Sequence, residues 1–218
     1  MAGDTPLNER ATVAHGYDAL GGRFAEWSSA VIDPARDEFF ADFLGRLPSG
    51  ARLLDVGCGS GMSWTGGVAT RFALTGIDIS PAQVETARRN VPAGTFIVAD
   101  VTAMEFEDGE FDGATALYSI GHLPVDEHEV VFARLARWLR PGGLLLASLP
   151  ADEDPGSTGA WLDGVEMFFA SLGAARYEQI LRDQGWRVIA ARIGVANEPE
   201  GDARFFWVLA TAPEPDAP

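Results

Sequence analysis

The sequence predicts an α/β protein with a mostly parallel sheet and helices on both faces of that sheet. Three observations lead to this prediction. From residue 51 onward, short apolar runs alternate with helical segments, as they do in βα units. A glycine-rich turn follows the first of these runs. Two final apolar runs flank the hexapeptide NEPEGD, which is typical of a β-hairpin and predicts one antiparallel strand near a sheet edge.

Helical segments are expected before the sheet. Residues 11–30 predict a helix that is broken at the pair Gly21 and Gly22. Residues 34–44 predict a second helix, which Gly45 closes.

Within the sheet region, each helix has its own start or stop signal. Ser80 is a suitable N-cap, Pro81 suits the first helical position, and Gln83 has the spacing of a capping box. Asp126 and Glu129 have the same spacing. The expected helices of this region cover residues 62–72, 81–90, 126–139 and 174–184.

The expected strands are short apolar runs bounded by glycine, proline or polar turns. They cover residues 51–56, 74–79, 95–99, 111–119, 144–149, 186–195 and 204–212. Residues 151–173 are less regular and mix glycine, aspartate and aromatic residues.

Composition narrows the class of protein. The chain of 218 residues has the size of one domain, and 32 acidic against 16 basic residues give a formal net charge of −16. This charge disfavours nucleic acid as a partner, because no basic cluster offsets it. We expect no membrane span and no signal peptide. The single cysteine, Cys58, excludes an intramolecular disulfide, so these features together favour a cytoplasmic protein.

The segment LLDVGCGSG contains the strongest functional signal. Gly57, Gly59 and Gly61 follow a strand and precede a helical segment, where the backbone must turn tightly and let a ligand approach. One alternative is that these glycines only form a tight turn and bind no ligand. Another is that they form a dinucleotide-binding site, but the G-x-G-x-x-G pattern of such a site would need glycine where the chain has Met62.

Acidic residues at the ends of neighbouring strands complete this pattern. Asp78 follows Gly57 by 21 residues, close to the spacing expected for a carboxylate that accepts hydrogen bonds from ribose hydroxyls. A strand-end acid that faces water is the alternative. Asp55 and Asp100 end two other strands at the same edge, so the three acids delimit a crevice of nucleoside size.

At this point the chain resembles the class I S-adenosylmethionine-dependent methyltransferases, especially the small bacterial methyltransferase-domain type. The resemblance covers residues 11–212 and rests on segments that occur in the family's order. These segments are LLDVGCGSG, LTGIDIS, FIVAD, FDGATALYSIGHLP and RWLRPGGLLLASL. This resemblance implies a Rossmann-like fold with a seven-stranded sheet and one antiparallel strand. It also implies S-adenosylmethionine as the cofactor and S-adenosylhomocysteine as its product.

The resemblance also implies one methyltransferase domain over residues 1–218. Its expected parts are a helical lid (1–50), a cofactor-binding core (51–150), a substrate-side insert and helix (151–185), a closing hairpin (186–212) and a flexible tail (213–218).

The same resemblance assigns cofactor contacts to positions of this chain. The glycines would face the methionine part, Asp78 the ribose, and Ile79 the adenine ring, while Asp100 and Val101 would meet the adenine amine. Tyr118 would lie near the amino group and sulfonium, and Tyr17, with Trp27 as a weaker candidate, would close over the cofactor. An ordinary half-buried helix tyrosine is the alternative for Tyr17. The full set of expected cofactor residues is Tyr17, Trp27, Asp55, Gly57, Cys58, Gly59, Gly61, Asp78, Ile79, Gln83, Asp100, Val101 and Tyr118.

Catalysis by such an enzyme needs alignment and exclusion of water more than a reactive side chain. We therefore expect no metal and no covalent nucleophile, and interpret Cys58 as a small buried residue. His122 and Tyr118 are the candidate catalytic residues, and His122 could remove a proton from an acceptor hydroxyl or amine. A histidine that packs or caps its loop is the alternative.

Residues 151–173 are expected to cover the acceptor with an apolar wall that includes Trp161 and Phe169. A helix packed on the sheet edge is the alternative. Arg23, Arg176 or Tyr177 could meet a polar group of the acceptor, and the sequence does not choose among them.

These expectations describe an enzyme that methylates a small molecule at an undetermined oxygen, nitrogen, carbon or sulfur atom, as a monomer or homodimer. The rivals are a protein or tRNA methyltransferase, a nicotinamide-dependent reductase, and a non-catalytic module that binds S-adenosylmethionine. The acidic charge and a fourth strand ending in Leu-Tyr-Ser-Ile argue against the first of these rivals.

Overall fold

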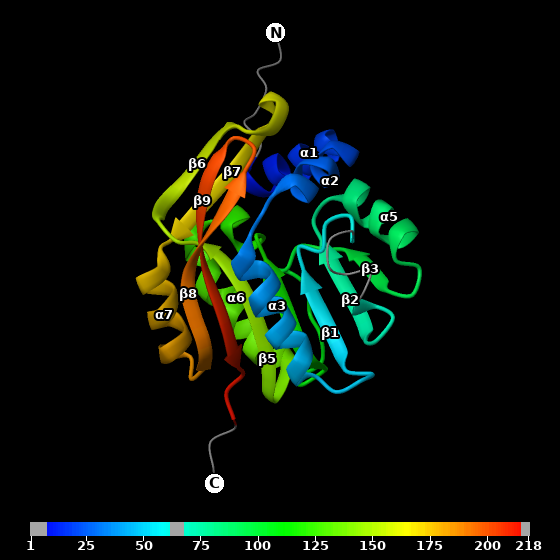
Figure 1. Cartoon of the computed structure of the whole chain (residues 1–218), viewed down its shortest axis with the longest axis vertical. Coiled ribbons are helices and arrows are strands. Elements are labelled where there is room, and N and C mark those ends of the chain that lie inside the picture. Colours follow the sequence, from blue (N-terminus) through cyan, green and yellow to red (C-terminus); the bar gives the residue numbers. More distant parts are fainter. Residues whose placement is uncertain (1–7, 62–67, 215–218) are drawn as a thin grey trace.

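A seven-stranded sheet organises the molecule, and the computed structural model describes residues 8–61 and 68–214 of it (Figure 1). The strand order is β3-β2-β1-β4-β5-β9-β8, and β9 is antiparallel to both of its neighbours while the other pairs are parallel. The strands are β1 (Arg52–Val56), β2 (Ala73–Asp78), β3 (Thr95–Val98), β4 (Phe111–Leu117), β5 (Leu139–Pro150), β8 (Arg187–Glu198) and β9 (Gly201–Thr211). The predicted fold class is therefore confirmed.

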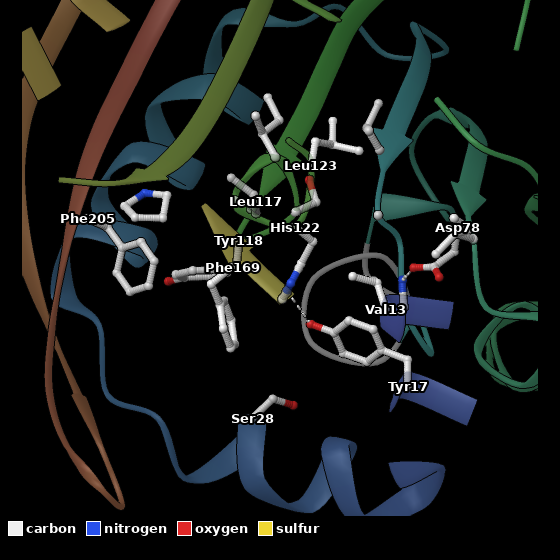
Figure 2. A pocket seen from close by; sticks show the side chains of 18 of the residues that line it. Val13, Tyr17, Ser28, Asp78, Leu117, Tyr118, His122, Leu123, Phe169 and Phe205 are labelled. Carbon is white, nitrogen blue, oxygen red and sulfur yellow. Dashed lines mark hydrogen bonds between the residues drawn. The ribbon is translucent and has the colours of Figure 1, made fainter. Parts of the chain in front are cut away.

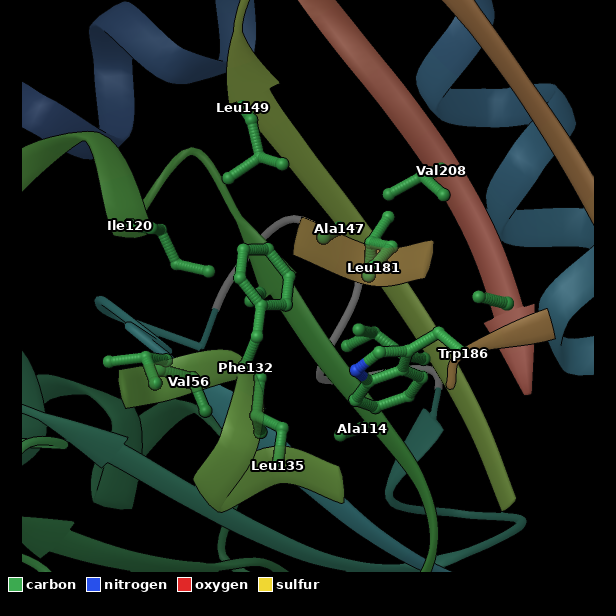
Figure 3. Packing of buried hydrophobic residues seen from close by; sticks show 14 of the residues in the cluster. Val56, Ala114, Ile120, Phe132, Leu135, Ala147, Leu149, Leu181, Trp186 and Val208 are labelled. Atoms are coloured by element: carbon green, nitrogen blue, oxygen red, sulfur yellow. The ribbon is translucent and has the colours of Figure 1, made fainter. Parts of the chain in front are cut away.

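Helices cover both faces of the sheet, because the strands are apolar on both sides. One core cluster contains Leu54 with side chains of α6 and α7, and the other contains Leu53 with side chains of α3 and α5. Phe132, fully buried at the centre of the first cluster, is shown in Figure 3. Burial of one such side chain contributes roughly 1.5–3 kcal/mol. The helices are α1 (Glu9–Leu20), α2 (Gly22–Ala30), α3 (Pro34–Arg46), α5 (Pro81–Asn90), α6 (Val125–Trp138) and α7 (Ala174–Asp183).

The register of the parallel strands places functional positions at one edge. Val56 pairs with Ile77, and Asp78 pairs with Val98, so β1, β2 and β3 end side by side. Helices α1 and α2 lie above this edge together with a second sheet, β6–β7 (Figure 1). These elements form a cover over the carboxyl ends of the strands.

The second sheet differs from what the sequence predicts. Residues 151–173 form an antiparallel pair, β6 (Glu153–Ala160) and β7 (Glu166–Leu172), rather than an irregular insert or a helix. β7 contributes its buried residues Met167, Phe168 and Ala170 to a third core cluster under α1 and α2. A two-stranded sheet is marginal alone, so packing on these helices stabilises it.

Most element boundaries agree with the prediction, and the exceptions have local causes. Gly45 lies inside α3 rather than closing it. β8 and β9 extend through most of NEPEGD, because strand pairing continues to Glu198 opposite Gly201. The expected helix over 62–72 falls largely on residues 62–67, which lie outside the described residues.

The two expected capping boxes are not formed as predicted. Ser80 does cap α5, since its hydroxyl accepts from the Gln83 backbone N–H at 3.1 Å. The Gln83 side chain, however, donates to the carbonyls of Tyr17 and Gly21 instead of returning to Ser80. Pro124 is the N-cap of α6, without a side-chain cap, so Asp126 lies within the first turn. There its charge still favours the helix through the helix dipole.

None of the described helices combines the length and apolar composition that a membrane crossing requires.

Candidate functional site

A cavity of about 480 Å³ lies between the carboxyl edge of the sheet and its cover. This volume is within the range of small-molecule sites. All expected site residues except Asp55 and Gln83 line it. They are Tyr17, Trp27, Gly57, Cys58, Gly59, Gly61, Asp78, Ile79, Asp100, Val101, Tyr118 and His122.

The glycine turn after β1 forms the floor of the cavity at a point that excludes side chains. Gly57 has φ +73°, and a Cβ atom there would lie 2.3 Å from Cβ of Ser119. The next residue, Cys58, is buried, and burial raises the pKa of its thiol. Cys58 is thus a neutral packing residue, while the glycines allow a ligand to approach the backbone.

Asp78, at the end of β2, orients the same turn. One carboxylate oxygen accepts from the Gly59 N–H and the other from the Ser80 N–H, both at 2.9 Å. Burial raises the pKa of Asp78, and these two hydrogen bonds oppose that effect. Each oxygen retains acceptor capacity, so this group can also accept from hydroxyls of a ligand in the cavity.

Asp55 and Gln83 have structural partners outside the cavity. The Asp55 carboxylate accepts from the Thr115 hydroxyl at 2.7 Å and faces a small gap under α3. Gln83 holds the C-terminal end of α1, as described above. Both residues support the site from behind rather than lining it.

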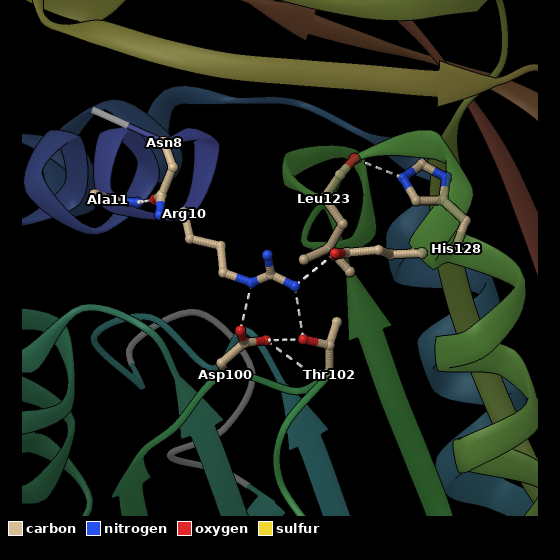
Figure 4. A network of polar contacts seen from close by, with 8 residues as sticks. Asn8, Arg10, Ala11, Asp100, Thr102, Leu123 and His128 are labelled. Atoms are coloured by element: carbon tan, nitrogen blue, oxygen red, sulfur yellow. Dashed lines mark hydrogen bonds and ion pairs between the residues drawn. The ribbon is translucent and has the colours of Figure 1, made fainter. Parts of the chain in front are cut away.

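The Asp100 carboxylate forms an ion pair with an arginine, Arg10, that the sequence analysis did not single out. The Arg10 guanidinium on α1 donates to Asp100, to the Thr102 hydroxyl at 2.8 Å and to Glu127 at 2.6 Å (Figure 4). The carboxylates of Asp100 and Glu127 raise the pKa of Arg10, although burial opposes them. Arg10 therefore ties α1 to the loop after β3 and to the start of α6.

A second tie joins α1 to the loop after β4. His122 Nδ1 lies 2.9 Å from the Phe168 carbonyl, which can only accept, so Nδ1 carries the proton and Nε2 accepts from the Tyr17 hydroxyl at 2.8 Å (Figure 2). Burial lowers the pKa of His122 to about 4. The histidine is thus neutral with both nitrogens engaged, unlike the base with an ordinary pKa that the sequence suggests.

Tyr118 adopts a strained backbone conformation at the end of β4. Its φ of +56° is rare for a residue with a side chain, and such strain costs on the order of 1–3 kcal/mol. Its hydroxyl donates to buried Asp33 at 2.8 Å, and its ring contacts Phe205 and Trp207 edge to face. The side chain therefore lines the cavity but directs its hydroxyl toward α3.

Aromatic rings from α1, α2 and the β6–β7 sheet enclose the cavity. Tyr17, Phe24, Trp27 and Trp161 form mutual ring contacts with centroids 5.0–6.2 Å apart. Phe169 joins them through Trp161, at 5.6 Å. This wall agrees with the expected apolar pocket and can exclude water from it.

The polar residues that the sequence offered for the acceptor lie elsewhere. Arg23 pairs with Asp163 and Arg176 with Glu129, both at the surface. Tyr177 is buried and bonds His128 at 2.9 Å. The sequence offered these three residues because it does not show which of their side chains face the cavity.

Sequence reasoning also missed residues that line or support the cavity. Asp33 carried a usable signal, since an aspartate before Pro34 is typical of an N-cap, and it does accept from two N–H groups of α3. Arg10, Glu198 and Phe205 also line the cavity, and they carried no such signal, because none of them belongs to a ligand-binding motif.

In the described part of the chain, no group of three or more His, Cys, Asp or Glu side chains is arranged to hold a metal ion.

Comparisons with known proteins point to one family. Residues 53–143 match the family model described as a methyltransferase domain. A protein named O-methyltransferase from Pyrenophora dematioidea is 33% identical over 173 residues, which are 73% of this chain and 63% of that protein. A trans-aconitate 2-methyltransferase from Paracidovorax citrulli is 36% identical over 57% of this chain and 50% of its own length. The chain thus spans between half and two thirds of these relatives.

The fold has close counterparts among solved structures. The 1,6-didemethyltoxoflavin-N1-methyltransferase of Burkholderia thailandensis, solved with 1,6-didemethyltoxoflavin and S-adenosylhomocysteine, superposes with a TM-score of 0.71. The alignment covers 97% of this chain and 93% of that one at 18% identity, so the similarity is one of fold.

Proposed function

We propose that this chain, which matches a methyltransferase-domain model over residues 53–143 and resembles the class I S-adenosylmethionine-dependent methyltransferases, transfers the cofactor's methyl group to a small molecule held in the cavity. The single observation that carries the proposal is the arrangement of Asp78. Its carboxylate orients the glycine turn and faces the same cavity. This is the arrangement that a ribose and the methionine part of one ligand require.

The residues on this side of the cavity fit S-adenosylmethionine. At Gly59 an added Cβ would meet only a ring carbon of Phe24 at 3.8 Å, so a ligand in the cavity can lie against the backbone there. We propose that Asp78 accepts from the ribose hydroxyls and that Ile79, Asp100 and Val101 meet the adenine. When bound, the cofactor supplies an activated methyl group on a sulfonium, so neither a metal nor a covalent nucleophile is required.

The protein's own contribution is alignment and exclusion of water. The cover formed by α1, α2 and β6–β7 encloses the acceptor side with aromatic rings, which favours a small apolar or amphipathic molecule. Holding the acceptor in line with the methyl group supplies a large part of the rate enhancement.

We further propose that His122 positions the cover through Tyr17 rather than acting as a general base. Both ring nitrogens are engaged and the pKa is about 4, so the imidazole attracts a proton weakly at neutral pH. Deprotonation of an acceptor hydroxyl or amine would then rely on water or on the acceptor's own acidity. The atom that receives the methyl group is undetermined.

Titration calorimetry tests the cofactor assignment. We expect micromolar binding of S-adenosylhomocysteine and no heat from NADH. Binding of NADH without binding of S-adenosylhomocysteine would refute the proposed function in favour of a reductase. Radiolabelled methyl transfer from S-adenosylmethionine to a set of small phenols, amines and carboxylic acids then distinguishes an enzyme from a binding module.

A further inference from the structure

The cavity has a second polar end, opposite the residues proposed to hold the cofactor. Figure 2 shows Asp78 and Phe205 on opposite sides of the cavity, with Tyr17 and His122 between them. Glu198, at the tip of the β8–β9 hairpin, and Tyr118 also line the cavity. This end is built by β4, β8, β9 and the segment before α3.

Glu198 is half-buried there, and within the described residues its carboxyl has no hydrogen bond and no ion pair. Its position is well defined, because an isolated bridge pairs Ile32 with Asn197, the residue before it. Burial and the nearby carboxylates of Glu200 and Asp33 raise the pKa of Glu198 to about 7. An ionised Glu198 therefore lacks compensating charge in this environment.

The two arginines at this end already have acidic partners. Arg204 donates to Asp152 at 2.6 Å, and Arg36 lies 3.4 Å from Asp37. Asp33, which is 1% exposed, is satisfied by Tyr118 and by two N–H groups of α3. Glu198 is thus the carboxyl at this end that retains full capacity for a ligand.

The walls beside this carboxyl suit a cation as well. Trp27 lines the cavity, and its indole N–H donates to Glu200 at 2.6 Å, which fixes its ring. Phe205 and Tyr118 meet edge to face with centroids 4.8 Å apart. Aromatic faces attract ammonium groups, and a carboxylate nearby adds to this attraction.

We propose that Glu198 determines acceptor specificity by binding a positively charged amine of the acceptor, while the aromatic walls hold the acceptor's apolar part. This inference rests on the proposed function, because it assigns acceptor binding to the end of the cavity that the proposed cofactor site leaves free. The substrate class is therefore a small amphipathic amine. An anionic acceptor would instead meet the like charge of the Glu198 carboxylate.

Three probes that share one phenol ring and differ in side-chain charge test the inference. They are tyramine (cationic), 4-ethylphenol (neutral) and 3-(4-hydroxyphenyl)propionate (anionic). Each is titrated by calorimetry into the complex with S-adenosylhomocysteine. We expect tyramine to bind at least about tenfold more tightly than 4-ethylphenol, as for a hydrogen bond to a charged group, and the anion to bind most weakly.

The Glu198→Gln variant should lose the preference for tyramine and bind 4-ethylphenol as the wild type does. Asp202→Asn, on the same hairpin, is the matched control, because Asp202 is exposed and bonds Asn197 instead of lining the cavity. This control should keep the preference.

Failure of the inference is separable from failure of the proposed function. If S-adenosylhomocysteine does not bind, the proposed function fails. If it binds and the three probes then give equal responses, including none, or the anion binds best, the inference is overturned and the cofactor assignment stands. Preference for tyramine in Glu198→Gln would also overturn it.

Discussion

The hydroxyl of Tyr17 donates a hydrogen bond to Nε2 of His122 across 105 positions of the chain. It joins the first helix to the loop after β4 and is partly buried. Together with the contacts of Arg10, it holds α1 over the cavity. These contacts and those of Asp78 lead to five predictions.

Tyr17→Phe should loosen the cover. The substitution keeps the ring contacts but leaves His122 Nε2 buried without a donor, which costs about 1–3 kcal/mol. Hydrogen exchange over α1 and α2 should quicken in the complex with S-adenosylhomocysteine. Tyr177→Phe is the control, since it removes buried hydrogen bonds to His128 and to the Leu172 N–H away from the cavity. It should lower stability without changing exchange in α1, and equal exchange in both variants would argue against the role of Tyr17.

His122 should stay neutral over the physiological range. The folded pKa of about 4 lies below the ordinary value of 6.5, so the unfolded state binds a proton first. Its contribution to stability is fully present above pH 6.5 and is lost as pH falls toward 4, on the order of 3 kcal/mol. The chain has three histidines, so proton NMR can follow His122, identified by its loss in His122→Asn. Titration near pH 6.5 would restore the general-base hypothesis.

Two variants of His122 distinguish a positioning role from general-base catalysis once an acceptor is known. If His122 acts as a base, His122→Ala should lower the methylation rate by about 10²–10⁴-fold and change its pH profile. If it positions Tyr17, His122→Asn, which can also donate and accept, should recover most of the rate. Cofactor affinity should remain nearly unchanged in both variants.

Asp78→Ala should weaken binding of S-adenosylhomocysteine by roughly 1.5–3 kcal/mol, because a charged acceptor is lost. The glycine turn also loses the bond from Gly59, so part of the effect reflects loss of preorganisation. Asp112→Ala serves as control, since Asp112 likewise accepts a backbone N–H, from Arg52, but lies outside the cavity. Calorimetry should show a loss only for Asp78, and unchanged affinity there would place the ribose carboxylate elsewhere.

The cover should respond to the cofactor. In wild-type protein, exchange over residues 11–30 is expected to slow when S-adenosylhomocysteine is added, because lids must open to admit ligands. Arg10→Gln removes ties to Asp100 and Glu127 and should speed exchange of α1 in the free protein. Arg46→Gln, which breaks an exposed pair within α3, should leave it unchanged. Protection that is equal with and without ligand would reject a mobile lid.

Much of the fold could be predicted from sequence because its signals are local. The alternation of apolar runs and helices, the glycine turn and the Ser80 cap depend on neighbouring residues and on backbone preferences. The same holds for the place of Asp78 beside the glycine turn, which follows from a strand end at a fixed distance from that turn. Residues 151–173 were less predictable, since β6–β7 is stabilised by packing on helices from the other end of the chain.

The sequence by itself determined the α/β fold, the resemblance to one methyltransferase family and the edge of the sheet that borders the cavity. Only the tertiary structure decided that Gln83 holds α1, that Asp100 pairs with Arg10, that His122 is a buried acceptor, and that Tyr118 bonds Asp33. These outcomes depend on residues 66 to 105 positions apart. Burial and charge at such contacts set the pKa and the free hydrogen-bonding capacity of each group, and neither quantity is encoded by a local motif.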